Sequence, residues 1–209
     1  MNHRSGASTA LFGIVLVAAI SVHRLSGFEQ RTSGSPHLVR AVFAGFWRLE
    51  RAFEERARVI AVNAGYAGGS AKNPRYEIVQ LGITGHAEAV QILYDPEVIQ
   101  YGRLLETYWR NIDPTDAGGQ FCDRGQQYRP IIFYGDDDQK AAAEASKAAL
   151  EAAGRFKRIV TQILPASTFW QAEPVHQGFY RTHPFEYQIY QTGCGREARL
   201  RDLWRASLR

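Results

Sequence analysis

One stretch decides the fold of this chain: Ala41-Val42-Phe43-Ala44-Gly45-Phe46-Trp47-Arg48-Leu49-Glu50-Arg51-Ala52-Phe53-Glu54-Glu55. It begins with an apolar run that ends at a glycine, which is typical of a buried strand. Apolar side chains then recur at helical spacing, so a helix is predicted whose first turn carries Phe46 and Trp47. A first helical turn has unpaired N–H groups and the positive end of the helix dipole. An anion or a developing negative charge is therefore stabilised beside two aromatic rings, which form an apolar wall for a small uncharged group.

The length, charge and composition of the chain limit the classes of protein to which it can belong. The chain has 209 residues, enough for one domain with a proper core, and a formal charge of +4. Lysine and arginine are scattered and no basic stripe is interleaved with aromatic residues, so we expect no nucleic-acid binding. The sequence has no Cys-x-x-Cys and no His-x-x-x-His spacing, so we expect no metal site.

Residues 1–37 differ from the rest of the chain. Arg4 precedes an apolar run from Ala10 to Val22, which is shorter than the roughly 20 residues of a membrane span and suits a signal-peptide core. An uncleaved anchor is one alternative. A disordered extension, or a start codon placed too far upstream, is another. Residues 23–37 are polar with glycine and proline, as in a linker. We therefore expect an exported protein, periplasmic or membrane-anchored, with a single domain at 38–209.

Two central segments each contain one polar side chain, Tyr66 or Glu88, that could belong to a site. The turn Gly65-Tyr66-Ala67-Gly68-Gly69 either places Tyr66 at a pocket or leaves it half-buried in an ordinary turn. The segment from Thr84 to Tyr94 is typical of a strand, in which Glu88 shares a face with apolar side chains. A carboxyl there takes up a proton or a partner, which would make it a general acid near neutral pH. The alternative is a glutamate at a solvated strand end.

The two cysteines, Cys122 and Cys194, could pair in an oxidising compartment. Cys122 lies in the polar segment 120–129, which precedes an apolar strand. A loop at the mouth of a sheet is where site residues usually lie, although a salt-bridged turn is the alternative. Cys194 lies between two glycines, either as a plain surface thiol or as a reactive one on a segment that can swing.

Five segments of the chain resemble the A-type peptide methionine sulfoxide reductases, over roughly Val39 to Trp204. That family has Ala-Gly-Gly-Cys-Phe-Trp followed by a helix that carries Glu, where this chain has Ala44, Gly45, Phe46, Trp47 and Glu50, without the Gly-Cys pair. The remaining matches are the segments 65–69, 85–90, 120–129 and 165–177. The resemblance implies an α+β single domain with a mixed sheet and packed helices, ferredoxin-like (split β-α-β), with a coil-rich C-terminus.

The family's activity is the thiol-dependent reduction of methionine S-sulfoxide in proteins, with no bound cofactor. Thioredoxin is the electron donor, or dithiothreitol in its place. The resemblance implies Glu88 as the acid on the sulfoxide oxygen, Asp123 and Tyr128 as residues that hold the centre, and Cys194 as the recycling thiol. It also implies that Phe46 and Trp47 receive the substrate methyl group and that Tyr66 helps to form the pocket.

The family's nucleophilic cysteine has no counterpart here. Reducing a sulfoxide without a metal or flavin needs a soft nucleophile, an acid and a second thiol. Three explanations are open: an inactive family member that binds methionine sulfoxide peptides, a weak enzyme that uses Cys122, or a coding sequence that has lost two codons. Asp123 beside Cys122 would slow that thiol. The loss also shortens the strand-to-helix turn, so either the helix starts earlier or Phe46 and Trp47 move relative to Glu88.

Overall fold

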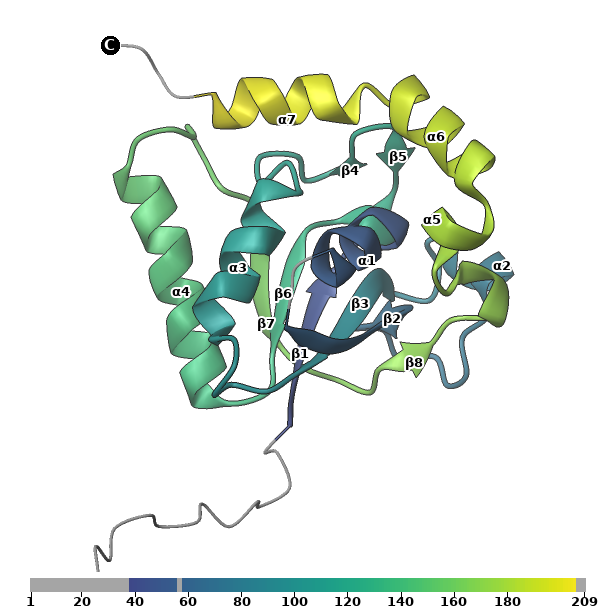
Figure 1. Ribbon diagram of the computed structural model, residues 1–209, viewed down its shortest axis with the longest axis horizontal. Helices are drawn as coiled ribbons and strands as arrows, with labels where there is room; N and C mark the ends of the chain where they lie inside the picture. Colours follow the sequence, from purple (N-terminus) through teal and green to yellow (C-terminus); the bar gives the residue numbers. More distant parts are fainter. Residues whose placement is uncertain (1–37, 56–57, 206–209) are drawn as a thin grey trace, which may run out of the picture. The chain divides into compact units, whose positions relative to one another are not determined.

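The computed structural model describes residues 38–55 and 58–205 (Figure 1). The signal-peptide or anchor segment and the linker expected at 1–37 lie outside the described residues, and the domain boundary at residue 38 stays a prediction. No helix among the described residues is long and apolar enough to cross a membrane.

A six-stranded sheet forms the centre of the fold, in the order β7-β6-β1-β3-β2-β8. All neighbours are antiparallel except β6 and β7. The four strands β6-β1-β3-β2 have the ferredoxin-like order, with β3 inserted between the two strands that α1 connects, so the expected mixed sheet and split β-α-β topology are confirmed. The strands are β1 (Val39–Ala44), β2 (Val59–Ala67), β3 (Ala87–Tyr94), β6 (Ile131–Tyr134), β7 (Gln162–Pro165) and β8 (Trp170–Gln171), with a separate hairpin of β4 (Gly119–Gln120) and β5 (Asp123–Arg124).

Helices pack on this sheet (Figure 1). They are α1 (Trp47–Glu54), α2 (Tyr76–Val79), α3 (Tyr101–Arg110), α4 (Asp137–Ala152), α5 (Phe179–Thr182), α6 (Pro184–Gly193) and α7 (Arg196–Trp204), with 3-10 turns at Gln126–Tyr128 and Pro174–His176. The side chain of Asp136 caps α4 by accepting a hydrogen bond of 2.7 Å from Gln139 N.

The C-terminal segment contains more helix than the coil we expected. Coil dominates between α4 and α5, but α5, α6 and α7 follow almost without interruption from Phe179. Gly178 and Gly195 adopt left-handed backbone conformations at the starts of α5 and α7, and Pro184 occupies the first turn of α6. Glycines that looked like signs of coil therefore separate short helices.

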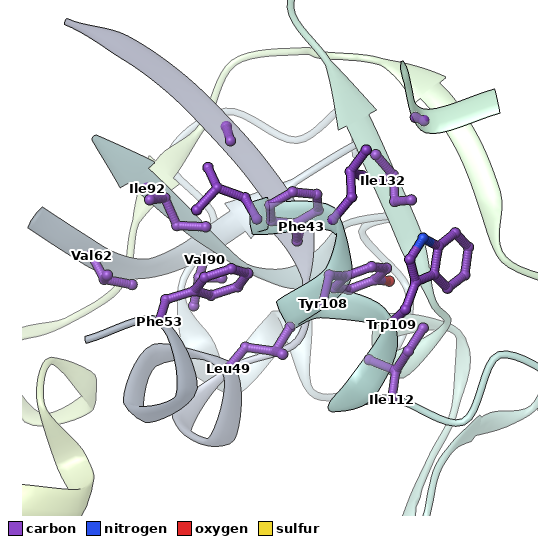
Figure 2. Close-up of a cluster of buried hydrophobic side chains, with 14 of the residues drawn as sticks. Phe43, Leu49, Phe53, Val62, Val90, Ile92, Tyr108, Trp109, Ile112 and Ile132 are labelled. Carbon is purple, nitrogen blue, oxygen red and sulfur yellow. The ribbon is translucent and has the colours of Figure 1, made fainter. Parts of the chain in front are cut away.

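The ring of Phe43 in β1 lies at the centre of the main core (Figure 2). It is fully buried and stacks on Phe53 of α1 and on Tyr108 and Tyr101 of α3, with centroid distances of 5.5, 4.9 and 6.0 Å. The opposite face of β1 packs against a second cluster that includes Phe133. Because β1 is buried on both faces, its sequence is a continuous apolar run and not an alternating one.

Replacing Phe43 by alanine should lower the free energy of unfolding by about 3–5 kcal/mol, because it removes a ring from the middle of a packed cluster. Urea denaturation measures the loss. Phe185→Ala is the matched control, since this side chain is 73% exposed, and we expect it to change stability by less than about 0.5 kcal/mol. Equal losses in the two variants would contradict this description of the core.

Candidate functional site

The turn between β1 and α1 positions the site. Gly45 N donates a hydrogen bond of 2.8 Å to the backbone oxygen of Glu88 in β3. The φ angle of Gly45 is +134°, a conformation that L side chains rarely adopt. The positive φ of the short turn therefore falls on a glycine. Phe46 caps α1 without a side-chain hydrogen bond, so the helix begins at Trp47.

A pocket opens at the N-terminal end of α1 and is lined by residues from several separate parts of the chain. Five predicted site residues line it: Phe46, Trp47, Glu88, Asp123 and Tyr128. Further lining side chains that were not singled out from the sequence include Arg48, Tyr76, Tyr190 and Arg196. The structure thus brings most of the predicted site together around one small volume, while the roles of these residues stay predictions.

Glu88 is the buried acid of the pocket. Its side chain lies on the same face of β3 as Val90, Ile92 and Tyr94, which belong to the main core, and only 6% of the residue is exposed. The alternative of a glutamate at a solvated strand end is therefore wrong. Burial, with a smaller contribution from the charge of Asp123, raises the pKa of Glu88 to about 8. At pH 7 the carboxyl carries a proton that it can donate.

Two tyrosines face the same pocket as this carboxyl. Burial raises the pKa values of both Tyr76 and Tyr128, and the charge of Glu88 contributes to each shift. Their hydroxyls therefore remain protonated and can donate hydrogen bonds to an oxygen atom. Tyr76 lies in α2, and its backbone N donates a hydrogen bond of 2.9 Å to Glu173 Oε1, almost a hundred residues later in the chain. No local pattern in the sequence distinguishes this tyrosine from a core residue.

Tyr66 lies behind the aromatic wall and does not line the pocket. It is completely buried, and its hydroxyl donates a hydrogen bond of 2.7 Å to Glu173 Oε2. Its ring lies 6.0 Å from that of Phe46, measured between centroids. Trp47 stacks on Phe179 of α5 at 3.9 Å. The two wall residues are therefore held by rings from β2 and α5, and Tyr66 contributes to the pocket through Phe46.

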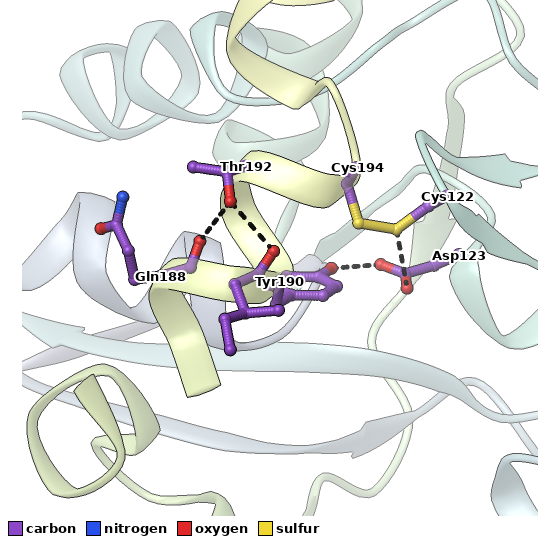
Figure 3. Close-up of a disulfide and its surroundings, with 7 residues drawn as sticks. Cys122, Asp123, Gln188, Tyr190, Thr192 and Cys194 are labelled. Carbon is purple, nitrogen blue, oxygen red and sulfur yellow. Dashed lines mark hydrogen bonds between the residues drawn. A yellow bond between two sulfur atoms is a disulfide. The ribbon is translucent and has the colours of Figure 1, made fainter. Parts of the chain in front are cut away.

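Asp123 joins the β4–β5 hairpin to the C-terminal helices (Figure 3). Its Oδ2 accepts a hydrogen bond from the hydroxyl of Tyr190 in α6. Burial raises the pKa of Asp123, while the hydrogen bond from Tyr190 and the charge of Arg196 act in the opposite direction. These partners lie more than sixty residues away along the chain. If the pairing of Cys122 with Cys194 had been used to restrain the fold, it would have placed Tyr190 near Asp123.

Cys122 and Cys194 form a disulfide with a Cα–Cα distance of 5.0 Å (Figure 3). Neither cysteine lines the pocket. Cys194, predicted as a recycling thiol, is thus paired with Cys122 at the outer side of the hairpin. Within residues 38–55 and 58–205 there is no group of three or more histidine, cysteine, aspartate or glutamate side chains placed to hold a metal ion.

Comparison with known proteins identifies similar chains. A family model described as peptide methionine sulfoxide reductase matches residues 39–208. The peptide methionine sulfoxide reductase MsrA of Listeria monocytogenes (strain HCC23) is 49% identical over 171 residues, which cover 80% of this chain and 97% of the relative. The MsrA of Bacillus subtilis (strain 168) is 51% identical over 169 residues, covering 79% and 96%.

Two solved structures are also similar. Methionine sulfoxide reductase A of Corynebacterium diphtheriae superposes with a TM-score of 0.64 and is 31% identical, covering 72% of this chain and 77% of that one. Mxr1 from Saccharomyces cerevisiae in its reduced form has a TM-score of 0.65 and is 29% identical, covering 71% and 87%.

Replacing Glu88 by glutamine should stabilise the protein, and the gain should grow as the pH rises. Below pH 4.5 the carboxyl is neutral in both states and the variants should be equal. Between 4.5 and about 8 the unfolded chain releases a proton that the folded chain keeps, so the native protein loses stability with rising pH. From pH 5 to pH 8 the loss relative to Glu88→Gln is on the order of 4 kcal/mol. Urea denaturation of both proteins at several pH values measures it, and a pH-independent difference would contradict the shift.

Proposed function

The chain belongs to the peptide methionine sulfoxide reductase family, and from this premise we propose that it acts on the S epimer of methionine sulfoxide in proteins. In this proposal it is a peptide-methionine (S)-S-oxide reductase, and a dithiol protein of the thioredoxin class supplies the electrons. One observation carries the proposal. A single pocket combines the aromatic wall of Phe46 and Trp47 with Glu88, a buried carboxyl whose pKa is raised to about 8.

The pocket suits the two ends of a methyl sulfoxide. The methyl group is apolar and packs against the rings of Phe46 and Trp47. The sulfoxide oxygen is a strong acceptor, and Glu88, Tyr76 and Tyr128 supply protonated donors on the other side. The two groups differ in their environment, so the pocket orients the sulfur atom that lies between them. A sulfoxide of the opposite configuration would exchange the positions of its oxygen and its peptide-bearing carbon.

The reduction itself takes two electrons and two protons. Two thiols become one disulfide, the sulfoxide becomes a sulfide, and the oxygen leaves as water. Glu88 delivers a proton to the oxygen while a thiolate attacks sulfur. No cysteine lies among the described residues that line the pocket. We therefore assign the attacking thiolate to the reductant, while this chain positions the sulfoxide and protonates it.

A second function, the binding of methionine sulfoxide peptides without reduction, is favoured by that same lack of a cysteine among the described lining residues. Binding needs only the wall and the donors. Comparing assays with and without a thiol distinguishes the two functions. Peptide binding is measurable without any thiol, whereas turnover requires one.

We also propose export to an oxidising compartment. The apolar run from Ala10 to Val22 suits a signal-peptide core, and the pairing of Cys122 with Cys194 is the kind of link that persists outside the reducing cytoplasm.

A variant with Gly-Cys inserted after Gly45 should reduce a peptide carrying the S sulfoxide at least about 100-fold faster than the natural chain. A thiolate held at a helix N-terminus is activated by the dipole, and its attack on the bound sulfoxide becomes intramolecular. Chromatography of the peptide in dithiothreitol follows the reaction.

The same chain with Gly-Ser inserted is the control for length, and it should be no faster than the natural chain. Equal rates in the natural chain and the Gly-Cys variant would contradict the prediction. Loss of the natural chain's turnover in Cys122→Ser would show that Cys122, and not the reductant, attacks sulfur. Isothermal titration with the peptide and no thiol tests the binding function: no binding at millimolar peptide would sink both proposals.

In cells that express the full chain, both cysteines should resist alkylation unless a reductant is added first, and the protein should fractionate with the periplasm or the membrane. Exported chains oxidise, whereas cytoplasmic chains keep their thiols. A cytoplasmic fraction with two reactive thiols per chain would contradict export.

A further inference from the structure

A groove lined mainly by arginine side chains lies beside the pocket. Its lining comes from α7, the helix drawn in yellow near the C-terminal end (Figure 1), from the first turn of α1 and from the last residue of α3. We call it the arginine groove, and the residues that define it are Arg48, Arg110, Arg201, Arg205, Leu200 and Trp204. Glu197 is the one acidic residue among the described residues that line it, so positive charge is in excess there.

The arginine groove continues from the pocket, because the same three elements contribute to both. Arg48 of α1 lines the pocket as well as the groove. Arg110 lines the groove at the end of α3, and Ile112, two residues later, lines the pocket. In α7, Arg196 lines the pocket and Glu197 lines the groove. A peptide that places one side chain in the pocket therefore has the groove as its neighbouring surface.

The protein itself neutralises little of the charge in the groove. Within residues 38–55 and 58–205, neither Arg48 nor Arg110 lies within ion-pair distance of a carboxylate. Arg201 and Arg205 have partners at 3.9 and 3.8 Å, and their side chains are 67% and 74% exposed. Exposed pairs of this kind contribute little. The groove therefore offers guanidinium donors to a ligand that is rich in carboxylates.

A buried arginine lies where the groove meets the pocket. Arg196 is 7% exposed, and its Nη1 donates a hydrogen bond of 3.3 Å to the backbone oxygen of Asn111, the residue after Arg110. Its Nε is buried without a hydrogen-bond partner among the described residues, as is the Nε of Arg48. The positive charge thus extends from the exposed groove to the edge of the pocket.

The dimensions of the two cavities suit different parts of one ligand. The pocket has a volume of about 70 Å³, enough for a single small group, whereas the groove has about 540 Å³. The nine residues of α7 span about 13 Å. An extended peptide advances about 3.3 Å per residue, so about four residues lie along this length.

The floor of the groove favours a peptide over a nucleic acid. Single-stranded nucleic acids bind by stacking bases on open aromatic faces. The ring of Trp204 is covered instead: the guanidinium carbon of Arg110 lies 4.5 Å from its centroid, and the ring of Phe156 meets it edge-on at 5.2 Å. Leu200 adds an apolar side chain beside this ring. The arginines and this floor suit acidic side chains with apolar stems.

We propose that the arginine groove determines substrate specificity by binding an acidic segment of the substrate protein, within about four residues of the oxidised methionine. Carboxylates of that segment pair with Arg48, Arg110 and Arg201 while the methionine sulfoxide occupies the pocket. The identity of the side chain in the pocket rests on the proposed function. The affinity of the groove for an acidic segment does not.

The first test compares two S-sulfoxide peptides, one with glutamates and one with glutamines beside the oxidised methionine. Isothermal titration of the full chain without a thiol should show about tenfold tighter binding of the glutamate peptide at about 50 mM salt. The preference should fall below about twofold at about 500 mM salt, because salt screens exposed charges. Equal affinities at low salt would overturn the proposal.

A double variant locates the preference on the molecule. Arg110→Gln/Arg201→Gln should bind the two peptides equally. Arg103→Gln/Arg158→Gln is the matched control, since it removes the same charge at exposed arginines that do not line the groove, and it should keep the tenfold preference. Equal loss in both double variants would assign the preference to net charge and overturn the groove.

Charge reversal separates electrostatic recognition from a structural role. Arg110→Glu/Arg201→Glu should bind a lysine-flanked sulfoxide peptide about fivefold more tightly than the glutamate peptide. A merely structural role would weaken all peptides alike, and that result would contradict the proposal. If urea denaturation shows that this variant is unfolded, Arg110→Lys/Arg201→Lys decides instead: it retains both charges and should retain the preference, whose loss would refute the groove.

An acidic peptide with norleucine in place of the oxidised methionine distinguishes failure of the groove from failure of the proposed function. If the sulfoxide strengthens binding and the acidic flank does not, the groove is refuted and the function stands. If the flank strengthens binding and the sulfoxide does not, the function fails and the groove stands. A single-stranded oligonucleotide that displaces the glutamate peptide and binds more tightly than it does would assign the groove to nucleic acid and overturn the proposal.

Discussion

The site depends on the hydrogen bond from Gly45 N to the backbone oxygen of Glu88. This bond continues the pairing of β1 with β3 by one residue beyond Ala44 and Ala89, so the end of the sheet and the start of α1 share one fixed point. On one side of that point the helix presents Phe46 and Trp47, and on the other β3 presents a buried carboxyl. This backbone hydrogen bond thus fixes the positions of the Phe46–Trp47 wall and of the Glu88 carboxyl independently of side-chain contacts.

Individual strands and helices were predictable because the spacing of apolar residues in the sequence follows the period of a strand or a helix. The apolar run and the helical spacing predict β1 and α1, and the alternation of β3 places Glu88 on the buried face. Tyr76, Tyr190 and Arg196 were missed because they reach the pocket through contacts across many tens of residues. Such contacts leave no period in the sequence. Only the pattern of a known family, matched residue by residue, brought distant segments such as 120–129 into one site.

Burial raises the pKa of Glu88, and this gives the pocket a proton donor at neutral pH. A carboxyl that remains neutral at pH 7 costs stability, and the cluster around Phe43 offsets the cost in the same face of the sheet. The Cys122–Cys194 disulfide lies outside this pocket. The two sulfur atoms are joined on the outer side of the β4–β5 hairpin, and Asp123 lies between them and the pocket. Asp123 therefore connects the disulfide-bonded hairpin with the pocket in which Glu88 holds its proton.

The central position of β1 also has a consequence for synthesis of the chain. Val39 pairs with Tyr94, and Val42 pairs with Phe133, although β1 is the first strand described. Contacts so distant in sequence form late, because the loops between them must close first. A nascent chain consequently has no complete core until β6 has left the ribosome. For most of its translation the growing polypeptide remains unfolded and exposes apolar strands, which makes it a substrate for chaperones and keeps it competent for passage through a translocation channel.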